Sequence, residues 1–123
     1  MRNFGRSIIA TSCMFASLTI PAVASSSKPP AYLGTWGTSL ADCKQPLDAK
    51  DGPAVLTEKD YVQYQTHCTF GPLVYHRYAW HTKAVCDTAG TKQDDSLDIS
   101  VSGDALMLVW GKSQATVDYA RCK

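Results

Sequence analysis

A chain of 123 residues, 45% of them hydrophobic, is long enough to form one folded domain with its own core. Its 12 basic and 11 acidic residues give a formal net charge of +1, and no stretch of the chain is a basic cluster. Binding to nucleic acid or to an anionic membrane surface requires clustered Lys and Arg, so we expect neither as a partner.

The first 24 residues have the layout of a cleavable secretory signal. Two arginines precede an uncharged, mostly apolar run over residues 7–20, and small residues follow at Ala22 and Ala24. The run is shorter than the about 20 residues of a transmembrane anchor. Cys13 would be the acylated residue of a lipoprotein signal, but the apolar stretch continues past it. We therefore predict cleavage after Ala24, export to the periplasm or out of the cell, and no stable membrane insertion afterwards.

The mature chain is expected to begin with a flexible leader over residues 25–31, followed by a single domain over residues 32–123. Its first strand is predicted over residues 32–38, with Trp36 between two glycines that permit close backbone approach. Residues 39–52 read as a loop or one helical turn, because Asp, Pro and Gly punctuate them. Residues 54–57 read as a short strand.

Two longer strands are predicted next from alternating apolar and polar residues. The first covers residues 61–70 and the second covers residues 75–87, with Gly71-Pro72 breaking the chain between them. The side chains expected on the core face are Val62, Tyr64, Cys68 and Phe70 in the first strand, and Tyr78, Trp80, Ala84 and Cys86 in the second.

The clearest local signal is a hairpin near the C-terminus. Residues 97–101 and 105–110 flank Gly103-Asp104, a pair suited to a two-residue turn. This turn sets three apolar pairs on one face: Leu97 opposite Trp110, Ile99 opposite Leu108, and Val101 opposite Leu106. A last strand over residues 115–122 extends the face with Val117 and Tyr119. The fold class is therefore all-β: an antiparallel meander closing as a seven- or eight-stranded barrel.

Four cysteines remain after signal cleavage, an even number in an exported chain, which favours two disulfides. Their spacings are far wider than those of zinc ligands, so we predict no metal site. Spacing alone allows three connectivities. The predicted topology favours Cys68–Cys86, on the core faces of successive strands, and Cys43–Cys122, because a closed meander brings the last strand beside the first.

No residue pattern points to catalysis or to a cofactor. The three histidines, His67, His76 and His81, have no ligand spacing natural to a strand, and no serine lies in a nucleophile motif. Asp94-Asp95 reads as a polar loop tip. A calcium site that adds Asp98 is the alternative, but the EF-hand pattern is absent. We expect no enzymatic activity and no cofactor.

One segment has the composition of a binding site. Residues 75–81 hold three aromatic residues, two histidines and one arginine, and Tyr, Trp and Arg are enriched in binding hot spots. With Tyr78 and Trp80 assigned to the core, the residues expected to contact a partner are Tyr75, His76, Arg77 and His81.

The chain resembles a known family in a few positions. Gly34-Thr35-Trp36 near the mature N-terminus, the spacing of Cys43 and Cys68, and the overall size are similar to those of periplasmic inhibitors of secreted metalloproteases. Tyr119 to Cys122 (Tyr-x-Arg-Cys) is also typical of small exported bacterial β-proteins. The resemblance implies an eight-stranded barrel, and it implies that residues 25–31 would enter a protease cleft.

Two functions remain open at this point. The first is a non-catalytic binding protein of the cell envelope, a monomer that acts on another protein as an inhibitor or immunity-type factor. The second is a small-molecule carrier that holds an apolar ligand inside the barrel, as eight-stranded barrels can.

Overall fold

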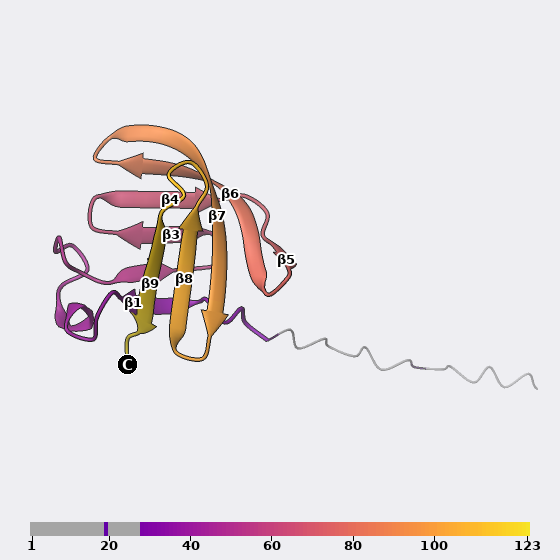
Figure 1. Cartoon of the computed structure of the whole chain (residues 1–123), viewed down its shortest axis with the longest axis horizontal. Helices are drawn as coiled ribbons and strands as arrows, with labels where there is room; N and C mark the ends of the chain where they lie inside the picture. The colour runs from indigo at the N-terminus through magenta and orange to yellow at the C-terminus, as the bar shows by residue number, and fades with distance from the viewer. Residues whose placement is uncertain (1–18, 20–27) are drawn as a thin grey trace, which may run out of the picture.

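The computed structural model describes Thr19 and residues 28–123; the predicted signal and residues 25–27 of the leader otherwise lie outside the described residues. The described part is a single antiparallel sheet with one 3₁₀ turn, η1 (Asp42–Lys44), and Figure 1 colours it along the chain from indigo to yellow. The strands are β1 (Gly34–Gly37), β2 (Ala54–Leu56), β3 (Asp60–Gln63), β4 (Thr66–Phe70), β5 (Val74–His76), β6 (Ala79–Thr88), β7 (Thr91–Ser102), β8 (Ala105–Trp110) and β9 (Thr116–Arg121).

Eight of these strands form a closed barrel, which confirms the predicted fold class. The sheet order is β4-β3-β2-β1-β9-β8-β7-β6, and pairing of β4 with β6 closes the ring. β5 lies outside this ring and shares an edge of β6 with β4. β4 pairs with residues 84–88 of β6, and β5 pairs with residues 79–81.

The interior of the barrel is filled by side chains from all parts of the ring. Its completely or almost completely buried members are Trp36, Leu56, Cys68, Leu97, Ile99, Leu106 and Leu108. The predicted C-terminal hairpin is confirmed in its register, with Ile99 opposite Leu108 and Val101 opposite Leu106. Gly103 adopts a φ of 59° at the turn, a conformation that glycine reaches without steric cost. Tyr119 continues the core beside Leu106, also as predicted.

The prediction of one strand over residues 61–70 was wrong. The chain reverses at Tyr64-Gln65, which joins β3 to β4, and Tyr64 has a left-handed φ of 42°. Reversal changes which side chains face the core: Tyr61 is buried in β3, whereas Val62 and Tyr64 are 40% and 45% exposed. Cys68 and Phe70 in β4 are buried, as predicted.

The prediction of one strand over residues 75–87 was wrong for the same reason. The chain reverses at Arg77-Tyr78 between β5 and β6, which leaves Tyr78 86% exposed and outside the core. Ala84 and Cys86 do face the core. The polar loop tip expected at Asp94-Asp95 was also wrong, because β7 begins at Thr91 and pairs these residues with Val85 and Ala84.

Both predicted disulfides are confirmed, Cys43–Cys122 and Cys68–Cys86. Cys68 and Cys86 are directly paired across β4 and β6. Cys43–Cys122 lies at one of the two narrowest seams of the ring. β1 and β9 pair over only two residues, as β2 and β3 do, against nine between β6 and β7. The Cys122 amide donates to the Thr35 carbonyl at 2.9 Å, and the Arg121 guanidinium lies 4.2 Å from the Trp36 ring.

Candidate functional site

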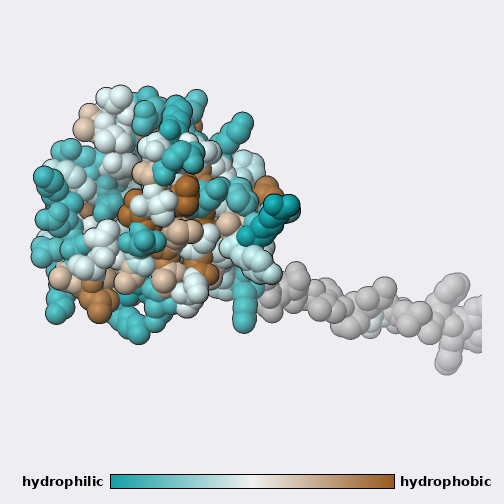
Figure 2. Space-filling view, in the orientation of Figure 1, coloured by the Kyte–Doolittle hydropathy of each residue, from teal (hydrophilic) through white to brown (hydrophobic). Residues whose placement is uncertain are grey.

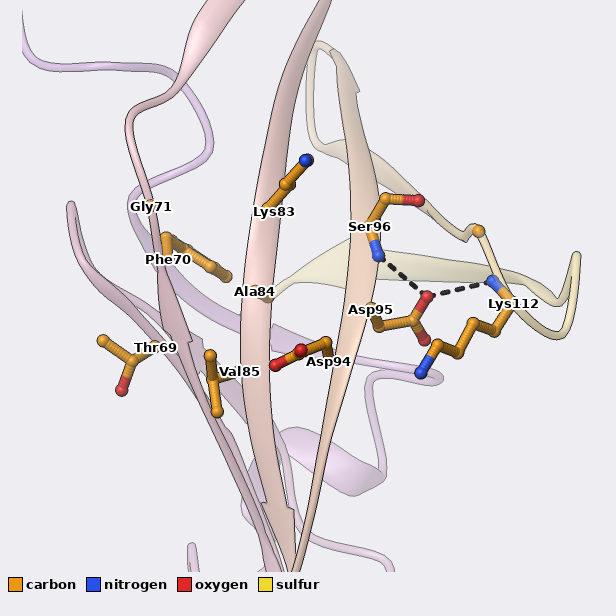
Figure 3. Close-up of a pocket in the computed structure, with 11 residues that line it drawn as sticks. Thr69, Phe70, Gly71, Lys83, Ala84, Val85, Asp94, Asp95, Ser96 and Lys112 are labelled. Carbon is orange, nitrogen blue, oxygen red and sulfur yellow. Dashed lines mark hydrogen bonds between the residues drawn. The ribbon is translucent and has the colours of Figure 1, made fainter.

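A groove of about 900 Å³ lies on the outer face of β4, β6 and β7 (Figure 3). One wall is the chain leaving β4, and the other is the start of the loop between β8 and β9. Its lining residues are Thr69, Phe70, Gly71, Lys83, Ala84, Val85, Asp94, Asp95, Ser96, Gly111 and Lys112.

Strand register explains why these side chains meet. Thr69 lies opposite Val85, and Val85 lies opposite Asp94, so one row of outward side chains crosses three strands. In the next outward row, Lys83 lies opposite Ser96. The floor is mainly apolar and the rim is charged.

The β8–β9 loop is held against β7 by hydrogen bonds of its backbone amides to the Ser96 carbonyl and to the Asp95 carboxylate. The Gly111 amide donates to the Ser96 carbonyl at 2.9 Å, and the Asp95 carboxylate accepts from the amides of Ser96 and Lys112 at 2.8 and 2.9 Å (Figure 3). Glycine at position 111 permits this approach, because a Cβ there would lie 3.2 Å from the Ser96 Cβ and closer still to its hydroxyl, so the Ser96 side chain would have to move. Asp95 is therefore a structural residue of the groove wall.

The Cys68–Cys86 disulfide lies directly under the groove. It joins the residue pair next to Thr69 and Val85, and because side chains alternate along a strand it faces the core while they face outward. The disulfide cross-links β4 and β6, two of the three strands that form the groove floor, so the floor cannot open between these two.

Three charged side chains at the rim remain available for a ligand. Within residues 28–123, none of the ion pairs includes Lys83, Lys112 or Asp94. An apolar floor with unpaired charges at its edge suits a ligand that buries an apolar group and places polar groups around it.

The residues predicted to contact a partner lie on the β5–β6 hairpin, beyond one end of the groove. His81 is on the outer face of β6, two residues from Lys83 of the groove. His76 lies close to it, with 6.4 Å between the two ring centroids. Tyr75 is on the other face of β5, where its ring packs 4.8 Å from that of Trp80, and Arg77 is in the turn. The structure therefore brings His76 and His81 together and points Tyr75 elsewhere.

Sequence reasoning missed Tyr78, the most exposed large hydrophobic side chain of the hairpin. Arg77 and Tyr78 have φ values of 52° and 66°, as a type I′ turn requires. Such turns favour Asn and Gly, and other residues pay of order 1–2 kcal/mol each to adopt this conformation. The turn overhangs a second hollow of about 630 Å³, whose floor includes Ser100 and Met107 on β7 and β8. Figure 2 shows hydrophobic side chains gathered in the middle of this face.

His81 is held through both ring nitrogens. Nδ1 lies 2.6 Å from Asp98 Oδ1, and Nε2 lies 3.0 Å from the His76 carbonyl oxygen. The Asp98 hydrogen bond and then the His76 carbonyl raise the pKa of His81 above its ordinary value, against a smaller opposing effect of desolvation. A general base needs a free nitrogen facing its proton donor, and here Nε2 faces a carbonyl instead.

A buried polar cluster inside the barrel also escaped the sequence analysis. The hydroxyls of Tyr61 and Tyr119 lie 3.0 Å apart, and both lie within hydrogen-bond distance of Gln63 Oε1, at 2.5 and 3.2 Å. Burial raises the pKa of both tyrosines, so both stay neutral. We interpret this cluster as structural.

Among the described residues, no group of three or more His, Cys, Asp or Glu side chains is arranged to hold a metal ion, including Asp94, Asp95 and Asp98. The same part of the chain contains no helix with the length and apolarity needed to cross a membrane. The chain matches no protein-family model, no curated protein and no solved structure. Cys43 and Cys68, whose spacing supplies part of the resemblance to metalloprotease inhibitors, belong to different disulfides.

Proposed function

We propose that the mature chain is a non-catalytic binding protein of the periplasm or the secreted fraction, acting on another protein as an inhibitor or immunity-type factor. The observation that carries this proposal is the groove on β4, β6 and β7, with its apolar floor and its charged rim. Protein interfaces combine an apolar centre with a polar rim in this way. A loop of the partner would insert an apolar side chain over Val85, and its polar groups would meet Lys83, Lys112 and Asp94.

The rigidity of the groove supports inhibition rather than a loose contact. Its floor is cross-linked by Cys68–Cys86, and its wall is tied down by the hydrogen bonds of Asp95. A preformed surface loses little conformational entropy on binding, which favours high affinity. The two disulfides are also compatible with an oxidising compartment, where an exported protein meets its partner.

The hairpin residues His76, Arg77 and His81 would form the second part of the interface, together with Tyr78. Arg and Tyr are enriched in binding hot spots, and Tyr78 is 86% exposed. A turn that keeps Arg and Tyr where Asn and Gly would be more stable is typical of a site selected for contact rather than stability.

A small-molecule carrier is the second candidate. Side chains occupy the barrel interior, so a carried ligand would bind in the surface groove, whose volume of about 900 Å³ falls within the range of ligand pockets. Native mass spectrometry of the protein purified from its own host tests this function. An added mass that persists favours the carrier, and a clean mass of the mature chain favours the protein-binding function.

The experiment that tests the proposed function is affinity capture from periplasmic and secreted fractions, with two matched variants. Val85→Glu places a charge on the groove floor, and Val62→Glu makes the same change at an exposed valine of β3, outside the groove. We expect one stoichiometric protein partner with the wild type and with Val62→Glu, and none with Val85→Glu. No partner in repeated trials at low and moderate salt, or a partner retained equally by both variants, contradicts the proposal.

A further inference from the structure

The two hydrogen bonds of the His81 ring define its protonation state. Both partners, the Asp98 carboxylate and the His76 backbone carbonyl, can only accept. Both ring nitrogens must therefore carry a proton for both bonds to form at once, which makes this ring an imidazolium.

Loss of one proton changes the contact with the hairpin. The bond to the carboxylate is charge-assisted and the stronger of the two, so the remaining proton stays on Nδ1. The lone pair of Nε2 then faces the His76 carbonyl oxygen at 3.0 Å. Two acceptors at this distance repel each other, so an attraction that holds the hairpin becomes a repulsion.

The hairpin is a part of the fold that such a change can move. β5 pairs with β6 over only three residues, and its other edge has no strand partner within residues 28–123. The His76 carbonyl immediately precedes Arg77 and Tyr78, the two residues with left-handed φ. A short strand that ends in a strained turn depends on each remaining contact.

Among the groups that face His81 from the neighbouring strands, Asp98 is the counter-ion. Asp98 faces it from β7, and the residue opposite Asp98 on β8 is Val109. On β5, Val74 lies directly opposite His81. The imidazole of His76 is close enough that a positive charge on it would repel the charge on His81. Lys83 follows on the same face of β6.

We propose that protonated His81 is a switch that holds the β5–β6 hairpin against the barrel, and that loss of its proton releases the hairpin. The effect of this switch on partner binding rests on the proposed function. Because the hairpin borders the groove, the partner would bind more tightly at low pH than at high pH. Histidine is the residue whose charge changes in this range. The switch itself is a property of the isolated protein.

The test combines two measurements on the mature, oxidised protein labelled with ¹⁵N. A ring titration by NMR should find His81 doubly protonated at low pH and protonated on Nδ1 at high pH. Amide hydrogen exchange at about pH 5.5 and about pH 8.5, on either side of the ordinary histidine pKa of about 6.5, should then show faster opening of residues 76–79 at the higher pH after correction for intrinsic rates. The opening of the hairpin should increase by at most tenfold for each unit by which the titration finds the pKa of His81 raised. The increase should be smaller than this limit, because the contact with Asp98 remains in the released hairpin and its share of the pKa rise is not lost.

Matched variants separate the switch from general effects of pH. His81→Gln should abolish the pH dependence of hairpin opening, and His67→Gln, which removes an exposed histidine paired with Asp60, should not. Asp98→Asn keeps the shape of the side chain and should move the opening to lower pH, which tests the switch even if His81→Gln does not fold. Equal corrected exchange at both pH values, a proton on Nε2 in the neutral ring, or equal effects of His67→Gln and His81→Gln would overturn the inference. None of these results depends on a partner, so they leave the capture experiment unaffected.

Discussion

Removing the two disulfides separately should distinguish the entropy of loop closure from the packing of the barrel interior. Cys43–Cys122 closes a loop with a sequence separation of 79 residues, and Cys68–Cys86 closes one of 18. The loop-entropy relation gives about 4.5 kcal/mol for the longer loop and about 3.2 kcal/mol for the shorter one. At about 4–8 °C per kcal/mol for a domain of this size, the Cys43→Ser, Cys122→Ser protein should melt about 20–35 °C lower than the wild type.

By loop length, removing Cys43–Cys122 costs more stability than removing Cys68–Cys86, but replacing Cys68 and Cys86 by serine should reverse this order because both positions are buried. Cys68 and Cys86 are inside the core, at 0% and 6% exposure, so two serines there add buried hydroxyls at about 1–3 kcal/mol each. Two alanines avoid that cost. We therefore expect the smallest loss of stability for the double variant Cys68→Ala with Cys86→Ala. The double variant Cys43→Ser with Cys122→Ser should lose more, and Cys68→Ser with Cys86→Ser should lose the most.

Thermal and urea unfolding of the three double variants, followed by circular dichroism, measures this order. If the alanine pair at positions 68 and 86 costs more than the serine pair at 43 and 122, loop length does not decide the contribution of these disulfides. Single replacement of Cys122 provides a control, since it leaves a free thiol at position 43 and should reduce the yield of folded protein below that of the double variant.

Three further predictions follow from single positions. Replacing Arg77-Tyr78 by Asn-Gly should relieve the left-handed backbone at about 1–2 kcal/mol per residue, and should therefore raise the melting temperature by about 8–30 °C while weakening capture of the partner. An unchanged or lower melting temperature contradicts the account of the turn. Gly37→Ala should lower the free energy of unfolding in urea by about 1–3 kcal/mol, since a Cβ there would lie 2.6 Å from the Ser39 carbonyl oxygen and 2.9 Å from Cys43 Sγ. The pKa of His81 is raised in the folded protein. Protonated His81 therefore contributes its full stabilisation below the unfolded pKa of about 6.5 and loses it as the pH rises through the folded pKa. The free energy of unfolding should consequently depend less on pH in His81→Gln than in the wild type.

The sequence predicts the fold well where turn chemistry and alternation agree. Gly103-Asp104 lies between two alternating apolar runs, so a single two-residue turn determines the register of the whole hairpin. The turns at Tyr64-Gln65 and Arg77-Tyr78 carry no Gly, Asn or Pro, and nothing local distinguishes them from strand residues. The left-handed backbone of Tyr64, Arg77 and Tyr78 accompanies the antiparallel pairing of the strands on either side of each turn.

The candidate site was harder to predict than the fold. The groove depends on the β8–β9 loop reaching β7 through Gly111 and Asp95, a contact between segments that are separate in the sequence. The sequence places Asp95 in a loop, because nothing in it shows that β7 begins as early as Thr91. The aromatic and basic composition of residues 75–81 did identify the hairpin, but it assigned Tyr78 to the wrong side because the reversal was not recognised.

The narrow seam between β1 and β9 gives Cys43–Cys122 a topological role. Eight strands form a ring only while these two strands stay together. Apart from the disulfide, two residue pairs, the Cys122–Thr35 hydrogen bond and the contact of Arg121 with Trp36 hold them. With the covalent bond cut, the ring can open at this seam into a curved ribbon with an unpaired edge on each side. Free edges of this kind invite pairing with the same edges of another molecule, by strand exchange or by sheet growth. Reduction of Cys43–Cys122 would therefore remove the covalent link across this seam and leave closure of the ring to non-covalent contacts alone.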